Sequence, residues 1–93
     1  RAKRPDADLG LSPEVLAEMM EETLRRMYAK WPGQPLPALA GKTPRQAVTT
    51  PAGLERVKGL IRMYEASEQR QAAQQGRRTI SFDLLWQALG ISP

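Results

Sequence analysis

The chain has 93 residues, 41% of them hydrophobic and 5% aromatic, with a net charge of +4. This length and composition suit one small domain with a single, mainly aliphatic core. The sequence contains neither histidine nor cysteine, which excludes His/Cys zinc sites, disulfide bonds, and Ser–His or Cys–His nucleophile pairs. No apolar run approaches the roughly 18 residues that a membrane span needs.

Residues 1–10 are charged, contain proline and glycine, and show no apolar periodicity. We therefore expect a flexible arm at 1–10 followed by a single helical domain at 11–93. The chain begins at Arg1 instead of methionine, which indicates a piece of a longer protein. The lack of cysteine favours a cytoplasmic location.

A first long helix is expected over residues 12–31. Ser12 can cap its N-terminus, and Pro13 suits the first helical position. Apolar residues then recur at helical spacing as far as Trp31, and Pro32-Gly33 should end the helix.

The polar face of this helix has glutamates before arginines, and we expect Glu21–Arg25 and Glu22–Arg26 pairs there. Its methionines are open to two interpretations, an adaptable binding groove or flexible filler of the core, and the second is favoured. They are Met19, Met20 and Met27.

The proline-containing stretch that follows is either a free linker or an ordered connector. Leu36 and Leu39 make it too apolar for a free linker, so we expect an extended segment that lays both leucines on the core. Thr43 and Gln46 match the two positions of a capping box and predict a helix of one or two turns. Thr50-Pro51 then begins the next helix, so the whole stretch should be ordered.

This second long helix should run from Thr50-Pro51 to near Gly76, with Gly53 in its first turn allowing close approach of another backbone. After Glu65 it has almost nothing to bury, so we expect an exposed extension, followed by a solvated loop at Arg77-Arg78. Its apolar stripe is Leu54, Val57, Ile61 and Tyr64.

A last short helix is expected from Ile80 to Ile91, capped by Ser81. Gly90 suits the left-handed position after it, and Ile91 should pack back on Trp86. The predicted fold class is all-α, a small bundle of two longer and two short helices with an ordered proline-containing connector. The predicted core unites Trp31, Leu36, Leu39, Val57, Ile61 and Leu85.

Candidate catalytic chemistry is sparse. The carboxylates lie mostly at helix-surface positions, and nothing selects a pair that converges in a cleft. Gly41-Lys42-Thr43 looks like the end of a phosphate-binding loop, but that motif needs a glycine where Pro37 stands, and a preceding strand. We therefore predict no enzyme activity, no cofactor and no metal site.

Residues 31–60 follow the pattern W-x3-P-x3-L-x-G-x2-P-x3-V-x-T-x2-G-x3-V-x2-L, over about a third of the chain. This pattern resembles the C-terminal toxin-binding domain of the Xre/MbcA/ParS antitoxins. The string PALAGKTPR is similar to a related C-terminal module of bacterial proteins that often carry a SEC-C zinc motif. The pattern's anchors are Trp31, Pro35, Leu39, Gly41, Pro44, Val48, Thr50, Gly53, Val57 and Leu60.

The resemblance implies a small helical, non-catalytic module that binds another protein, which in the antitoxins is a toxin of the RES type. Our leading hypothesis is a protein-interaction module of a larger bacterial protein, whose partner is toxin-like or another domain of the same protein. The alternative is a nucleic-acid-binding accessory domain, although the spread of the charges argues against it. A third hypothesis is a domain of an enzyme whose active site lies elsewhere in the full protein.

A partner should contact the outward-facing residues of the capped turn and of the next helix, because specific interfaces need a surface that the fold holds still. The other interpretation is that these side chains only keep the surface hydrated. The predicted partner-binding residues are Lys42, Arg45, Gln46, Arg56 and Lys58.

Overall fold

The computed structural model describes residues 12–93, which form four α-helices and two 3₁₀ turns and contain no strand. The all-α class is therefore confirmed. The arm expected at 1–10 and the domain boundary at residue 11 lie outside the described residues. The elements are α2 (Pro13–Met27), η1 (Trp31–Gly33), η2 (Pro37–Leu39), α3 (Pro44–Ala47), α4 (Pro51–Gln75) and α5 (Asp83–Leu89).

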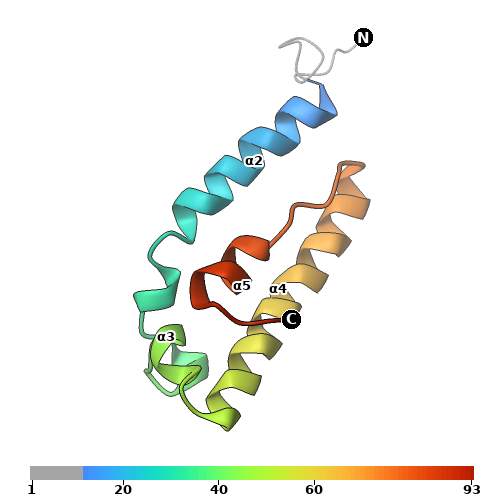
Figure 1. The fold of residues 1–93 in the computed structure, drawn as a ribbon. Helices are drawn as coiled ribbons and strands as arrows, with labels where there is room; N and C mark the ends of the chain where they lie inside the picture. The colour runs from blue at the N-terminus through green and yellow to red at the C-terminus, as the bar shows by residue number, and fades with distance from the viewer. Residues whose placement is uncertain (1–11) are drawn as a thin grey trace.

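The two long helices, α2 and α4, are joined at one end of the molecule by the connector of η1, η2 and α3 (Figure 1). After α4 the chain returns toward that end, and α5 lies between the two long helices. The short elements therefore lie together where the long helices are joined.

One buried cluster draws on every element except α2. Leu36 and α2's Leu24 pack against it from the edge, partly buried. The six residues predicted to share the core do meet there, so the connector is part of the core and not a linker. The buried members are Trp31, Leu39, Ala47, Val57, Ile61, Phe82, Leu85 and Trp86.

Aromatic rings attach the end of α2 to this core. The ring of Tyr28 lies 5.8 Å from the rings of both Tyr64 and Phe82, and 6.3 Å from that of Trp31, centroid to centroid. Such edge and tilted contacts add to the free energy of burial. Burial also raises the pKa of Tyr28. The indole N–H of Trp31 is buried without an acceptor among the described residues, which offsets part of this gain.

The first helix begins as predicted but ends earlier. The Ser12 hydroxyl accepts a hydrogen bond from the Val15 N–H at 3.1 Å, whereas the expected continuation of the helix to Trp31 is wrong. The helix ends at Met27, and the Trp31 N–H donates to the carbonyl of Tyr28 in a turn, at 3.1 Å. From Ala29 onward the N–H groups that bond locally reach three residues back instead of four, as the Ala29 N–H does to the Arg26 carbonyl at 3.4 Å, so the chain leaves the α-helix before Pro32.

The last helix is shorter than predicted. It spans Asp83–Leu89, because Ile80 is buried in the non-helical segment that precedes it. The Ser81 hydroxyl accepts from the Asp83 N–H at 3.0 Å, so Ser81 forms a turn before the helix and Phe82 occupies the N-cap position.

Both α4 and α5 end in left-handed glycines. Gly90 has φ +66° and the Ile91 N–H donates to the Trp86 carbonyl at 3.1 Å, which confirms the predicted end. At the end of α4, Gly76 also has φ +66°, and the N–H of Arg77 donates to the Ala72 carbonyl at 3.0 Å. These bonds are those of a Schellman motif.

Truncation of Leu39 tests whether the connector is part of the core. Leu39 is 3% exposed, so replacing it with alanine should lower the free energy of unfolding by about 2–5 kcal/mol. Urea denaturation followed by circular dichroism measures this change. A loss below about 0.5 kcal/mol, typical of surface substitutions, would show that the connector does not belong to the core.

Candidate functional site

The chain between η2 and α4 is held by two capped helix starts. The hydroxyl of Thr43 accepts from the Gln46 N–H, and the side-chain oxygen of Gln46 accepts from the Thr43 N–H, both at 3.0 Å. This is the capping box that the sequence predicts. The Thr50 hydroxyl likewise accepts from the Gly53 N–H at 3.1 Å. These local bonds stabilise one conformation of the loop.

At Gly53, the first turn of α4 lies directly against the end of α3. A Cβ atom on Gly53 would stand 2.0 Å from the carbonyl oxygen of Ala47 and 2.9 Å from the Thr50 hydroxyl. Real Cβ atoms essentially never come so close, so this approach requires glycine, as the sequence suggests. The contact fixes α4 relative to the loop that carries Lys42.

A hollow of about 190 Å³ lies beside this contact. Much of its lining is small and apolar, including Ala40, Ala47 and Ala52. Its only charged members are Lys42, from the loop, and Arg56, from α4. We call this feature the basic hollow.

Two of the five predicted site residues, Lys42 and Arg56, are thus brought together. Arg45 is exposed on α3 but does not line the hollow, and the side-chain oxygen of Gln46 is occupied by the capping box. Lys58 was expected on the exposed side of its helix, but its side chain is only 19% exposed, 3.9 Å from a carboxylate oxygen of Glu55. Its position two residues beyond Arg56 places it on the other side of α4.

The positive charge at this end of the molecule is largely uncompensated. Within residues 12–93, no salt bridge engages Lys42, Arg45 or Arg56. In the stretch 30–58, Glu55 is the only acid, and it pairs with Lys58. An anionic group would therefore meet two cations at the basic hollow with no competing carboxylate in its lining.

The described residues offer little else with site chemistry. Among residues 12–93, no group of three or more acidic side chains could hold a metal ion. Over the same residues, no helix combines the length and the apolar character needed to cross a bilayer. The basic hollow can bind and orient an anionic group, and its lining contains no carboxylate.

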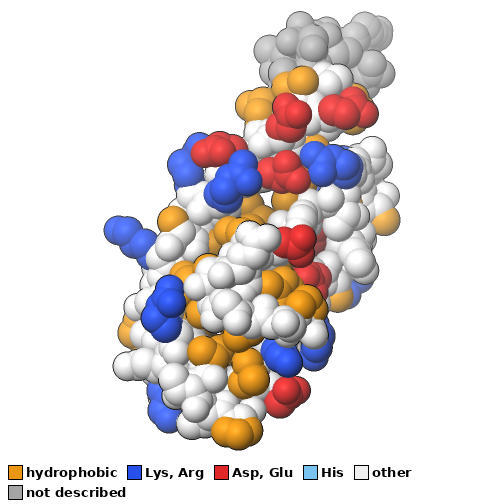
Figure 2. Space-filling view, in the orientation of Figure 1, with side chains coloured by type: hydrophobic (Ala, Val, Ile, Leu, Met, Phe, Trp, Pro, Cys, Tyr) orange, Lys and Arg blue, Asp and Glu red, His pale blue; other side chains and the backbone are white. Residues whose placement is uncertain are grey.

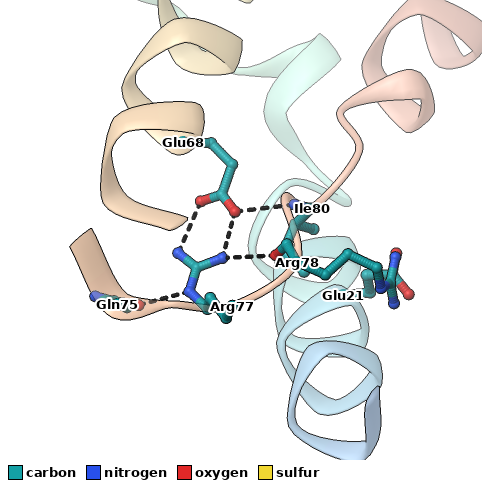
Figure 3. Close-up of polar contacts among 6 residues, drawn as sticks. All are labelled: Glu21, Glu68, Gln75, Arg77, Arg78 and Ile80. Atoms are coloured by element: carbon teal, nitrogen blue, oxygen red, sulfur yellow. Dashed lines mark hydrogen bonds and ion pairs between the residues drawn. The ribbon is translucent and has the colours of Figure 1, made fainter. Parts of the chain in front are cut away.

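A partly buried ion pair was not predicted from the sequence. Arg77 was expected in a solvated loop, yet its side chain is only 4% exposed and contacts Glu68, which is 11% exposed (Figure 3). Both Glu68 oxygens accept from the Arg77 guanidinium, one at 3.1 Å. One of them also accepts from the Ile80 N–H at 2.9 Å. The hydrogen bonds from Arg77 lower the pKa of Glu68, and the pair correspondingly raises the pKa of Arg77.

The apolar stripe of α4 contains the signal that could have revealed this pair. Val57, Ile61 and Tyr64 are followed at the same helical spacing by Glu68, so the carboxylate lies on the inner face and needs a partner there. The last turns of α4 are mostly exposed, as expected, but Glu68 is partly buried and Ala72, one turn further, is only 1% exposed.

The neighbouring Arg78 connects this segment to α2. It contacts Glu21 at 3.2 Å (Figure 3), so the expected Glu21–Arg25 pair is not formed. Arg25 contacts Glu22 instead, at 3.1 Å. The predicted Glu22–Arg26 pair is present at 3.6 Å.

The methionines of α2 do not fill the core as favoured by the sequence analysis. Met19 is 52% exposed and Met27 is 67% exposed, while Met20 is half-buried. Two grooves of about 390 Å³ each run along α2, one on its outer side and one between α2 and α4, and Met19 lines both. This face is a second candidate interaction surface.

No protein-family model, no curated protein and no solved structure matches the chain. The basic hollow and the face of α2 therefore have to be interpreted from their own geometry.

Proposed function

We propose that the chain is a non-catalytic protein-interaction module of a larger bacterial cytoplasmic protein. The antitoxin-like, toxin-binding type of partner follows from the resemblance to the Xre/MbcA/ParS domain. The observation that carries the proposal is the basic hollow, in which Lys42 and Arg56, without salt bridges among residues 12–93, flank a small apolar lining on a capped loop.

The chemistry of the hollow favours an acidic side chain of a protein partner. Such a side chain has an aliphatic stem, which suits the alanines of the lining, and a carboxylate, which suits Lys42 and Arg56. Charge-assisted hydrogen bonds of this kind are about twice as strong as neutral ones. Because the loop is already held by its caps, binding costs less conformational entropy than ordering a free segment.

Nucleic-acid binding is supported less well, because the basic residues do not form one face. Lys58 lies on the far side of α4 from Arg56 and beside a carboxylate. Arg62 lies over the indole ring of Trp86, 5.9 Å from the ring centroid. Phosphate backbones are bound by clustered, accessible cations, so this arrangement favours a protein partner.

Reversing the charge of Arg56 should weaken partner binding at least about fivefold, equivalent to about 1 kcal/mol. The matched control is Arg70→Glu, because Arg70 is an exposed residue of the same helix but lies about 21 Å further along it. Calorimetric titration of each variant with a RES-type toxin domain measures the difference. Equal affinities for the two variants would contradict the assignment of the basic hollow, and no binding by the unchanged chain would contradict the toxin-binding type.

Titration with duplex DNA and with single-stranded RNA at low and high salt distinguishes the alternative function, nucleic-acid binding, from protein binding. Binding that is micromolar or tighter and falls steeply with salt would overturn the protein-interaction proposal.

A further inference from the structure

Helix α2 leaves part of its apolar surface uncovered by residues 12–93. Of its 15 residues, Ala17 is the only one buried within the domain. Val15 is 41% exposed, in addition to the exposed Met19 and Met27. Figure 2 shows apolar and charged side chains side by side on the arm of the molecule that α2 forms. An isolated helix of this length is marginally stable in water and depends on packing of its apolar face.

The exposed face of α2 offers both protruding side chains and grooves to receive them. Met19 stands between the two grooves that run along the helix, and Thr23 lines both of them. Helices pack by placing the ridges of one into the grooves of another. A surface that carries both ridges and grooves has the features that two copies need to pack against one another about a two-fold axis.

The order of charges along this face selects the orientation of a second copy. Glu18, Glu22 and Arg26 line the outer groove at intervals of four residues and so form one stripe. In a parallel pair of helices, each of these residues would face its own equivalent and repel it. In an antiparallel pair centred near Glu22, Glu18 of each copy faces Arg26 of the other. The two Glu22 carboxylates then face one another, but each is already paired with Arg25 of its own helix, at 3.1 Å. Glu18 has no salt bridge within residues 12–93, so it is available for this contact.

We propose that two copies of this chain pair through antiparallel α2 helices, with the apolar face around Met19 buried between them and Glu18–Arg26 contacts at the rim. The interface is separate from the basic hollow, which lies where the connector meets α4, so the pairing is independent of the proposed function. Methionine is enriched at protein interfaces, and here Met19 lies on a face of α2 that residues 12–93 leave uncovered.

Sedimentation equilibrium of the 93-residue chain tests the pairing, and we expect a reversible monomer–dimer equilibrium. Glu18→Arg and Arg26→Glu alone should each weaken it at least about fivefold, because each places like charges opposite one another. The combined variant should restore the dissociation constant to within about twofold. Arg70→Glu is the control, because that residue lies outside both grooves. A monomer at concentrations up to about 1 mM, or a double variant no better than the singles, would overturn the proposal.

Engineered cysteines test the orientation, and the chain offers a clean background because it has no cysteine of its own. Thr23 lies near the expected two-fold axis, so Thr23→Cys should form a disulfide-linked dimer under mild oxidation. Leu16→Cys should not, because six residues from the centre place the two copies' residues about 18 Å apart along the helices. Efficient linkage through Leu16→Cys, or none through Thr23→Cys, would overturn the antiparallel arrangement.

Discussion

Replacing Gly53 with alanine should lower the free energy of unfolding by about 3 kcal/mol or more. The added methyl group would collide with the Ala47 carbonyl at 2.0 Å, and this neighbour is backbone that cannot rotate away. The collision can be relieved only by moving α4 away from α3, which would separate Ala47 from Val57 in the core. Urea denaturation followed at the helix signal in circular dichroism measures the loss.

Gly59 provides the matched control on the same helix. No atom lies within 4 Å of a Cβ built there, so Gly59→Ala should raise the free energy of unfolding by about 0.5–1 kcal/mol through helix propensity alone. The two identical substitutions should therefore have opposite signs. Stabilisation by Gly53→Ala would show that α3 and α4 do not approach one another as described.

Replacing Arg77 with methionine should lower the free energy of unfolding by about 1–3 kcal/mol, because it leaves a partly buried carboxylate short of hydrogen bonds. The substitution keeps most of the side-chain volume but leaves the Glu68 carboxylate, 11% exposed, with the Ile80 N–H as its remaining hydrogen-bond donor. Arg78→Met is the control, because the pair of Arg78 with Glu21 is 50% and 27% exposed. Exposed pairs contribute about 1 kcal/mol or less. Equal losses of unfolding free energy in the two variants would therefore contradict the partly buried Glu68–Arg77 pair.

The same pair gives the domain a pH dependence of known sign. Because the hydrogen bonds from Arg77 lower the pKa of Glu68 in the folded state, the folded state binds its proton less readily than the unfolded state. The stabilisation is complete above the ordinary pKa of a glutamate and is lost as the pH falls through the lowered one. In the Glu68→Gln variant, the free energy of unfolding should therefore fall less steeply as the pH is lowered. An unchanged slope would show that Glu68 is not the source of this pH dependence.

Local sequence signals predicted three of the four helix starts, because each of these depends on residues three or four positions apart. Ser12, Thr43 and Thr50 all cap helices as expected, since a hydroxyl and a nearby N–H are enough to form the cap. The left-handed Gly90 was predicted for the same reason. The end of α2 was not predicted, because the helical periodicity continues to Trp31 although the chain leaves the α-helix after Met27.

Contacts between distant segments could not be predicted in this way. Arg77 and Glu68 are nine residues apart, and only the turn at Gly76 brings the guanidinium back to the helix. The exposure of Met19 and Met27 was missed because helical spacing shows that residues share a face without showing what covers that face. In the candidate site, helical spacing could have separated Lys58 from Arg56, because residues two apart lie on opposite sides of a helix. The meeting of Lys42 with Arg56 depends on how α4 meets the connector.

Site-specific photo-crosslinking in bacterial cells tests the central claim, that the surface at Arg56 contacts a protein. A photoreactive amino acid is placed at position 56 in one variant and at position 70 in another, and the adducts are identified by mass spectrometry and by nuclease treatment. We predict a discrete, nuclease-resistant protein adduct from position 56 and none from position 70. Purified, that protein should bind Arg56→Glu at least about fivefold more weakly than Arg70→Glu. Nucleic-acid adducts at position 56, the same adducts at both positions, or no adduct at all would contradict the claim.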